Sequence, residues 1–599
     1  MTNDQIDPQL GLGALPLGGD PEHIGRRRFL TGAGAAAGAG ALATVVPAGF
    51  AQAASPDDAS VFTPLAAAIR VADTRDLAVA VFTRVSDRHI RVKVKDRDGV
   101  PANASAVVLT ATAVNFGEPN FVTVYPTGDA LPVVSNLNMP RPAEATANLV
   151  TVKVGSNDSI DVYSRVPCDL IVDLLGFYTP VAGAARAGRF IGLASAARAI
   201  DTRDSFGFAQ SGSFTWVDLT SHVPSHASSV VINLTATECT APGYFTALPA
   251  SASESTQPAT SSLNVSYVGD TRASAVIVPV PTIGGKRRIK IYTLKAAKLI
   301  VDVTGYYTGD SSSLSTEGRF VPQSPVRILD TRLPGEIGKL WPGWVVERQV
   351  PGDAGTLGSA IVANVTGVES RGPGYLLVSA ARRPMPPTSN VNWTIAGATV
   401  PNHVITPLTA THGVQVFSSH GAHVLVDLAG YFTGTPQDAT LPAFTNPVPP
   451  IIGPPWVLKV PRMGLTSQVK DGDPHFVTDS GHSWHWTGTG FMGQEAHVAL
   501  FAHRTEAGGP YLYLHTMVIG DTFTITTSDN RVYTYRMVGR GLVTGNSNAG
   551  PPPTAILAAT RVYPGTTLSL IVCTKLNLLP TSLFHRLIVT GELIEWHEI

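Results

Sequence analysis

The segment Asp173-Leu174-Leu175-Gly176-Phe177-Tyr178 closes an apolar run, and the same pattern occurs twice more along the chain. The other copies run from Asp302 to Gly305-Tyr306-Tyr307 and from Asp427 to Gly430-Tyr431-Phe432. Apolar, β-branched and aromatic residues in short runs are typical of buried β-strands. The recurrence predicts a chain built mostly from three copies of one β module.

Two further motifs recur in the same order within each copy. The first is Asp-Thr-Arg, at spacings of 128 and 129 residues: Asp73-Thr74-Arg75, Asp201-Thr202-Arg203 and Asp330-Thr331-Arg332. The second is a polar turn: Ser135-Asn136-Leu137-Asn138, Ser261-Ser262-Leu263-Asn264 and Ser389-Asn390-Val391-Asn392. Together these motifs define modules at roughly 56–180, 187–309 and 317–434.

Within each module, runs of Val, Ile, Leu and Thr alternate with Gly, Pro, Asn and Ser about every ten residues. This spacing predicts an all-β fold of sandwich or barrel modules. The period is far longer than that of a solenoid, so we expect each module to bury its own core, like beads on a string. A Pro-rich stretch at 435–455 predicts an extended linker. It separates the modules from a last domain at 456–599.

The composition agrees with a turn-rich β protein. The chain has 599 residues with 57 Gly, 46 Pro, 15% charged residues and a net charge of -1. This balance disfavours a coiled coil, a charged disordered tail and a polybasic protein that binds nucleic acid. Three cysteines do not make a disulfide framework. Cys168 and Cys239 align with small residues in the other copies, so we expect them to be structural.

The first residues indicate export. Arg26-Arg27-Arg28-Phe29-Leu30 precedes a weakly hydrophobic Ala/Gly run that ends in the small-x-small site Ala51-Gln52-Ala53. The pattern resembles a twin-arginine signal, and we expect residues 1–54 to be such a segment. The alternative, a membrane anchor, needs a more strongly apolar run. The interpretation implies an extracellular or wall-associated protein without an integral membrane span.

The modules resemble a repeat common in secreted actinobacterial proteins, which has no established chemistry. Two interpretations of Asp-Thr-Arg remain open. An Arg fork beside a carboxylate is suited to sugar hydroxyls, which would make wall polysaccharide a partner. The same residues also form a structural ion pair and turn cap, and we favour this second interpretation because every module must solve the same folding problem.

In the last domain, apolar strands again dominate. His497–His503, Thr567–Cys573 and Leu587–Leu593 are expected strands, and Ser528-Asp529-Asn530 is a hairpin turn between two more. The set predicts a twisted sheet or small barrel.

Three chemically useful side chains lie at the ends of these strands. Alternation places Leu568, Leu570 and Val572 on one face and Ser569, Ile571 and Cys573 on the other. Arg586 begins the next strand, where it lies beside Cys573 if the two strands pair. His503 ends another strand. A thiol, an imidazole and a guanidinium are the nucleophile, acid/base and oxyanion stabiliser that acyl transfer requires.

The motifs around these residues resemble those of sortases, surface transpeptidases with a closed β-barrel, and most closely those of the actinobacterial class E/F. The matching segments, in the family's order, are Val460-Pro461-Arg462-Met463-Gly464-Leu465, Phe501-Ala502-His503-Arg504-Thr505, Leu568 to Cys573-Thr574 and His585-Arg586-Leu587-Ile588-Val589. Two departures are visible: Ala502 replaces the usual Gly, and Val572 replaces the usual Thr.

The resemblance implies that Cys573 is the nucleophile, His503 the general acid/base and Arg586 the stabiliser of substrate and oxyanion. The implied reaction cleaves a sorting signal like Leu-Pro-x-Thr-Gly through a thioacyl-enzyme and transfers the acyl group to a cell-wall peptide amine. No cofactor or metal is expected. Ordinary pKa values of about 8.5 for Cys and 6.5 for His leave few molecules in the ion-pair form at pH 7, which predicts slow turnover.

Other residues of this domain have simpler interpretations. His482, His485 and His497 were weighed as zinc ligands, but His-x-x-His on a strand places the rings on opposite faces. We instead expect a polar loop in which Trp484 and Trp486 line the peptide-binding groove. His585 should point away from the Arg586 face. The alternatives to a transpeptidase are a hydrolytic cysteine peptidase and a non-catalytic surface-binding array with a sortase-like relic.

Overall fold

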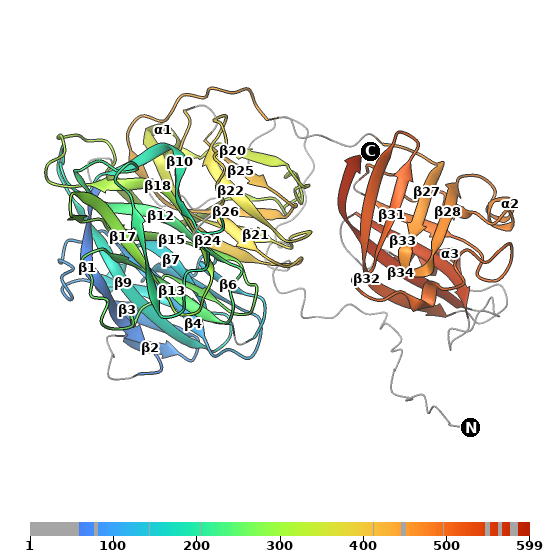
Figure 1. Cartoon of the computed structure of the whole chain (residues 1–599), viewed down its shortest axis with the longest axis horizontal. Coiled ribbons are helices and arrows are strands. Elements are labelled where there is room, and N and C mark those ends of the chain that lie inside the picture. Colours follow the sequence, from blue (N-terminus) through green and yellow to red (C-terminus); the bar gives the residue numbers. More distant parts are fainter. Residues whose placement is uncertain are drawn as a thin grey trace, which may run out of the picture. The chain divides into compact units, whose positions relative to one another are not determined.

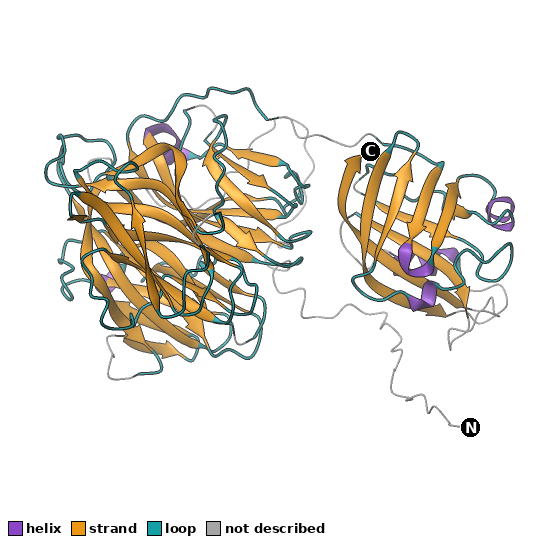
Figure 2. Cartoon of the chain, viewed as in Figure 1, coloured by secondary structure: helices purple, strands orange, loops and turns teal. Residues whose placement is uncertain are grey.

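A computed structural model describes residues 59–76, 82–142, 144–204, 207–410, 413–444, 451–494, 496–544, 551–560, 566–574 and 585–599. The predicted signal segment lies outside these residues. The chain divides into two compact units, with the change from one to the other at Asn446 and Pro447. Strands make up most of both units, and helices are few and short (Figure 2). The predicted all-β class is therefore confirmed.

The strands of the first unit form three groups along the chain, one within each predicted module. The first group is β1 (Ser60–Asp73), β2 (Phe82–Ser86), β3 (His89–Lys93), β4 (Ala106–Val114), β5 (Asn120–Pro126), β6 (Leu137–Met139), β7 (Thr146–Lys153), the 3-10 turn η4 (Ser156–Asp158), β8 (Ser159–Ser164) and β9 (Asp169–Pro180). The second is β10 (Phe190–Asp201), β11 (Ser213–Asp218), β12 (Ala227–Thr237), β13 (Gly243–Pro249), β14 (Leu263–Val265), β15 (Arg272–Pro279), β16 (Thr282–Ile283), β17 (Lys286–Thr293) and β18 (Lys298–Thr308). The third is β19 (Phe320–Asp330), β20 (Val345–Arg348), α1 (Gly352–Leu357), β21 (Gly358–Val368), β22 (Gly374–Ala380), β23 (Val391–Trp393), β24 (Val400–Pro407), β25 (Val414–Ser418) and β26 (His423–Thr433).

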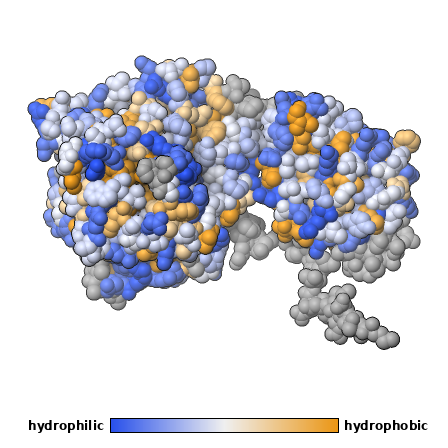
Figure 3. Space-filling view, in the orientation of Figure 1, coloured by the Kyte–Doolittle hydropathy of each residue, from blue (hydrophilic) through white to orange (hydrophobic). Residues whose placement is uncertain are grey.

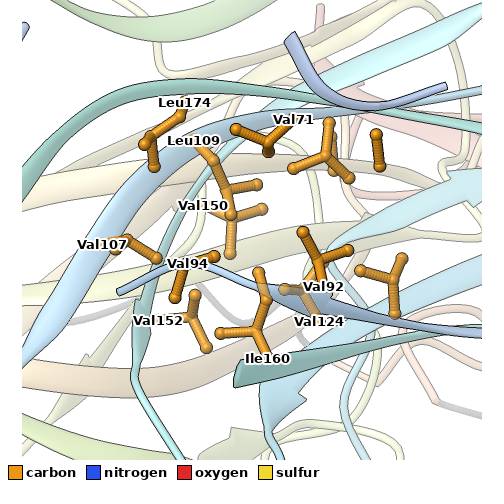
Figure 4. Packing of buried hydrophobic residues seen from close by; sticks show 14 of the residues in the cluster. Val71, Val92, Val94, Val107, Leu109, Val124, Val150, Val152, Ile160 and Leu174 are labelled. Carbon is orange, nitrogen blue, oxygen red and sulfur yellow. The ribbon is translucent and has the colours of Figure 1, made fainter. Parts of the chain in front are cut away.

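Each group contributes one set of inner strands and one outer sheet. The outer sheets are β2-β3-β8-β5-β6, β11-β17-β13-β14 and β20-β25-β22-β23. The inner strands of the first and third groups join in one eight-stranded sheet, β24-β21-β26-β19-β1-β9-β4-β7, while β10-β18-β12-β15 forms a separate sheet. In the first group Val107 and Val150 of the inner sheet pack against Val92, Val124 and Ile160 of the outer sheet (Figure 4). This is the packing of a β-sandwich.

The three groups also share a core, which contradicts the expected beads on a string. Six rings from all three groups gather at the centre, with centroid separations of 4.3 to 6.5 Å: Phe62, Tyr178, Phe190, Tyr307, Phe320 and Phe432. The Tyr178 and Tyr307 hydroxyls lie 2.5 Å apart. A Cβ at Gly176, the glycine of the repeated corner, would come within 2.5 Å of the Phe62 ring. That glycine is needed because the ring lies directly on the backbone.

Buried polar contacts join the groups around these rings. The Asn148 Nδ2 atom donates to the Asn364 side chain at 3.0 Å, and Asn402 donates to Asn233 at 2.9 Å. The His403 ring meets the Thr151 hydroxyl at 3.0 Å, and complete burial lowers the pKa of His403 to about 3. The unit therefore folds around a shared polar and aromatic centre.

The Asp-Thr-Arg motif has a structural role, as favoured from the sequence. The Asp73 carboxylate accepts hydrogen bonds from the Arg75 backbone N–H at 3.1 Å and from its Nε at 2.8 Å, which caps the turn. Arg70 bridges Asp73 and Asp173 and donates to the Ala259 carbonyl of the second group. The same cap and bridge recur at 198–203 and 327–332. Cys168 and Cys239 are free and contact the cores of their own groups.

The second unit is a closed barrel in the order β27-β28-β29-β30-β33-β34-β32-β31 (Figure 1). Its elements are β27 (Trp456–Val460), η5 (Pro461–Met463), β28 (Leu465–Lys470), α2 (Pro474–Asp479), β29 (Ser483–His485), β30 (His497–Phe501), η6 (Leu514–Thr516), β31 (Thr522–Thr527), β32 (Arg531–Thr544), α3 (Pro553–Thr560), β33 (Thr567–Thr574) and β34 (His585–Glu598). On the face of each unit visible in Figure 3, hydrophobic residues are scattered among hydrophilic ones. Among the described helices, none has the length and apolar character needed to span a bilayer.

The shared core predicts that damage in one group spreads to the others. Phe320 is fully buried and lies 4.3 Å from the Tyr178 ring. Phe320→Ala should destabilise the first unit by roughly 3–5 kcal/mol, because it leaves a large cavity. Hydrogen–deuterium exchange should then accelerate in β9 and β18 as well as in β26. Leu333→Ala, at a half-exposed site of the same group, is the control. Acceleration confined to residues 317–434 would restore the beads-on-a-string picture.

Candidate active site

Backbone pairing brings the three predicted residues together at one end of the barrel. Strand β33 lies between β30, which runs parallel to it, and β34, which runs antiparallel. Cys573 is directly opposite Arg586 in the β33–β34 register. On the other side Phe501 is level with Ile571, and the Ala502 N–H donates to the Ile571 carbonyl at 3.4 Å. His503 therefore follows β30 at the level of Cys573.

Cys573 and Arg586 share the outer face of the barrel wall. Ile571 and Ile588 pack with Ile556 and Leu557 of α3, so this face lies under the helix. Because side chains alternate along a strand, Cys573 points to the same face as Ile571. Arg586 joins it because directly opposed residues share a face. The intervening Val572 is fully buried. The expected strand is present at Thr567–Thr574.

The Cys573 thiol is partly exposed at the end of this row. Burial raises its pKa above the ordinary value for cysteine, and the Glu506 carboxylate acts in the same direction. The positive charges of Arg586 and Arg504 oppose both effects. Burial prevails, so the thiol form dominates at neutral pH. The electrostatics therefore leave little thiolate at neutral pH. The slow turnover predicted from the sequence stays a prediction.

His503 contacts two carboxylates. Its Nε2 lies 2.7 Å from Asp479 Oδ1 at the end of α2, and its Nδ1 lies 3.9 Å from Glu506 Oε2. The imidazole is largely buried, with 20% of its side chain exposed, whereas both carboxylates are mostly exposed. The backbone is also fixed, since the Tyr511 N–H donates to the His503 carbonyl at 3.1 Å. The ring is thus held in place by α2 from one side and by its own loop from the other.

Two cations flank the thiol in different ways. The Arg586 guanidinium lies 5.8 Å from the Phe501 ring centroid, and its Nη1 donates to the His585 carbonyl at 3.2 Å. Arg504 is buried and donates to the Thr574 hydroxyl at 2.6 Å, beside Cys573. Burial lowers the pKa of Arg504 below its usual value, and the charge of Cys573 counteracts that shift. Arg504 therefore fixes the end of β33, while Arg586 lies on the reactive face.

The two predicted groove tryptophans belong to the same outer face. Trp484 is level with Phe501 in the β29–β30 register, and its ring lies 5.6 Å from that of Trp486. Trp486 packs against the cluster that contains Phe501 and Ile571. Trp484, Trp486, Phe501 and Ile571 therefore form an apolar row across β29, β30 and β33. Ile571 precedes Cys573 by two residues on β33.

Two of the three histidines considered as zinc ligands, His485 and His497, have other partners. The His485 ring is buried, with Nδ1 2.6 Å from Asp471 and Nε2 2.9 Å from the Gly490 carbonyl. His497 Nδ1 lies 2.6 Å from the Thr567 hydroxyl. Across the described ranges no group of three or more His, Cys, Asp and Glu is placed to hold a metal ion. His585 is buried and occupies the strand position opposite Thr574, next to Arg586.

The sequence missed two residues at this site, Asp479 and Arg504. Asp473-Pro474 is a good start for a helix, because Asp accepts hydrogen bonds from free N–H groups and Pro suits the first turn. This signal could have found α2. It could not have revealed that the helix ends beside His503. Arg504 has no role of its own in the sequence prediction, whereas the structure buries it beside Cys573.

Residues 458–594 match the sortase domain family. Among solved structures, the SrtA sortase from Actinomyces oris is 19% identical and aligns with 25% of this chain and 88% of its own, with a TM-score of 0.22. Sortase E1 from Streptomyces coelicolor, solved with a tripeptide in its active site, is 23% identical over 24% of this chain and 89% of its own, with a TM-score of 0.20. Sortase E from Streptomyces avermitilis is 23% identical over 24% and 90%, with a TM-score of 0.20. Comparison with curated proteins gives no match. The second unit thus contains a sortase domain.

The charge of Arg586 should control the reactivity of Cys573. Arg586→Gln removes a cation that lowers the thiol pKa, so that pKa should rise and the thiolate fraction below it should fall. We expect alkylation of Cys573 by iodoacetamide at pH 7.5 to slow about threefold to tenfold, measured by mass spectrometry of the Cys573 peptide. Lys459→Gln removes an exposed charge from β27 and should leave the rate unchanged. Equal rates in all three proteins would contradict the assignment.

Proposed function

We propose that the second unit is a sortase-type cysteine transpeptidase whose catalytic residues are Cys573, His503 and Arg586. The supporting observation is the register of β33 within a sortase domain, which brings the three residues to adjacent strand ends on one face. A nucleophile, an acid/base and a cation in one row are the groups that acyl transfer needs.

In the proposed reaction the Cys573 thiolate attacks the scissile carbonyl carbon. A C–S bond forms while the carbonyl electrons move to oxygen, and Arg586 stabilises the resulting negative charge. The C–N bond then breaks, and His503 protonates the departing amine. An incoming amine gives a proton to His503 and displaces Cys573 from the thioacyl-enzyme. With water as the acceptor, the same intermediate gives hydrolysis.

The substrate would be a sorting signal like Leu-Pro-x-Thr-Gly, and the acceptor a cell-wall peptide amine. The apolar row of Trp484, Trp486 and Phe501 beside Cys573 is suited to the apolar residues of an extended peptide. We assign the domain to a class E/F-like sortase on the sequence motifs around His503 and Cys573. The twin-arginine-type segment at 1–54 would export the chain to the extracellular side or the wall.

A cysteine comparison tests the proposed activity. The full chain should cleave a fluorogenic Leu-Pro-x-Thr-Gly peptide and transfer its acyl group to hydroxylamine. Cys573→Ala should reduce the rate at least ~1000-fold, because no other group can form the thioacyl intermediate. Cys239→Ala, which replaces a buried thiol of the first unit, is the matched control and should stay active. Cleavage by Cys573→Ala would exclude the mechanism, and absence of cleavage by the unmodified chain would favour a non-catalytic relic.

A second candidate function, binding of wall polysaccharide, concerns the first unit. A cavity of about 400 Å³ is lined by Arg70 and Arg75 of the first group and by Tyr244, Gln257 and Asn264 of the second. The two arginines are paired with aspartates, which favours an uncharged polyol over a phosphate.

Aromatic rings also line the outer sheet from this cavity, with Tyr292 buried and the Lys290 ammonium 5.2 Å from the ring centroids of Phe214 and Trp216. Tyr244 lies 6.0 Å from Tyr292, which lies 5.2 Å from Phe214, and Trp216 of the same strand is 42% exposed. Aromatic faces next to a few polar groups are suited to sugar rings.

Retention on polysaccharide tests this second candidate. Trp216→Ala in the full chain should lower retention on protein-free cell walls and on an insoluble neutral polysaccharide about threefold or more, since it removes an exposed aromatic face. Ile283→Ala, at a similarly exposed site of the same group, should have no effect. A pulldown with quantified bound protein measures both. Equal retention of the two variants and the unmodified chain would exclude the surface.

A further inference from the structure

The carboxylates around His503 come from two different segments and are not equivalent. Asp479 Oδ1 makes a 2.7 Å contact with Nε2 from the end of α2. Glu506 Oε2 lies 3.9 Å from Nδ1 and belongs to the loop that follows β30. Glu506 also acts on Cys573, where its charge favours the protonated thiol. Asp479 thus makes the close contact with the imidazole, whereas Glu506 lies farther from the ring and also opposes the thiolate.

The position of Asp479 is determined by the fold of α2. The Asp473 carboxylate accepts hydrogen bonds from the N–H groups of His475 and Phe476 at 2.9 and 3.1 Å and so begins the helix. Val477 and Thr478 are buried at 4% and 3% exposure, which fixes the helix against the barrel. Asp479 follows them as the last helical residue. Its contact with His503 thus comes from a capped and docked element.

The Asp479 contact places a carboxylate directly on the His503 ring. In general, a carboxylate in hydrogen-bonding contact stabilises the charged form of an imidazole relative to the neutral form. The charged and titratable groups around His503 are Asp479 from α2, Arg504 and Glu506 from its own loop, Cys573 from β33 and Arg586 from β34. Both arginines favour the thiolate of Cys573. Asp479 is the group in hydrogen-bonding contact with the imidazole.

We propose that Asp479 is a positioning residue that holds the His503 ring by Nε2 and stabilises its positive charge, leaving Nδ1 to deliver the proton to the leaving amine. This inference rests on the proposed transpeptidase function. In the step concerned the C–N bond of the tetrahedral intermediate breaks, its electron pair takes the Nδ1 proton, and neutral imidazole remains bound to Asp479. The imidazole then recovers a proton from the incoming amine.

The structure also predicts that the two carboxylates have opposite effects on the thiol. Loss of Asp479 removes support for imidazolium, which is the counter-ion of the thiolate. Loss of Glu506 removes a negative charge that disfavours the thiolate itself. Alkylation of Cys573 can measure both effects without any assumption about the substrate.

The experiment follows iodoacetamide alkylation of Cys573 from pH 5 to pH 10 in the full chain. For Asp479→Asn we expect alkylation near pH 6 to slow about threefold to tenfold and to converge with the unmodified chain above pH 9, far above the ordinary imidazole pKa of about 6.5. For Glu506→Gln we expect faster alkylation at pH 8. Asp473→Asn removes a charge from the same helix while keeping a capping side chain, and is the matched control.

A second measurement separates this inference from the proposed function. In sorting-signal cleavage, the acid limb of the kcat/KM profile should move to lower pH in Asp479→Asn and its maximum should fall, while Asp479→Glu should restore part of the loss. Unchanged alkylation and cleavage profiles in Asp479→Asn would overturn the role of Asp479. A shifted alkylation profile in a chain that does not cleave the peptide would support Asp479 and reject the transpeptidase.

Discussion

The hydrogen-bond register of β33 is the constraint on which the candidate site depends. The strand pairs in parallel with β30 and antiparallel with β34, and only this double pairing places Cys573 level with Arg586 and just beyond Phe501. A slip of one residue would turn Cys573 toward the barrel interior and Val572 toward the reactive face. Packing resists that slip, because Ile571 and Ile588 lie under α3 while Val572 is fully buried on the other side.

Local sequence predicted the part of the site that depends on alternation. The faces of β33, the proximity of Arg586 and the exclusion of His585 all follow from a period of two. The pairing of β30 with β33 could not be predicted in this way, since it joins strands about 70 residues apart in a parallel pair that leaves no turn motif in the sequence. Asp479 was missed for the same reason: the capped helix is visible in Asp473-Pro474, but its contact with His503 is a tertiary contact.

In the first unit, the core within each group was predicted, but the core that the three groups share was not. The reason is again that tertiary contacts leave no local motif in the sequence. In the Gly-aromatic-aromatic corner, Phe177 enters the core of its own group and Tyr178 the shared core. Adjacent strand residues point to opposite faces, so two successive buried aromatics already indicate a strand covered on both sides. The partner of the second face was missing from the prediction, because the repeat pattern describes one module at a time. The domain boundaries themselves stay a prediction.

Burial and nearby charges act in opposite directions on the titratable groups of the proposed site. Burial disfavours the Cys573 thiolate more than Arg586 and Arg504 can offset, and Asp479 lies in hydrogen-bonding contact with His503. Such an arrangement keeps most of the resting thiol protonated at neutral pH. A peptide that binds over the apolar row next to Cys573 would exclude water from the thiol and the imidazole alike, which strengthens their mutual attraction. The electrostatics therefore favour a site whose ion pair forms with substrate rather than before it.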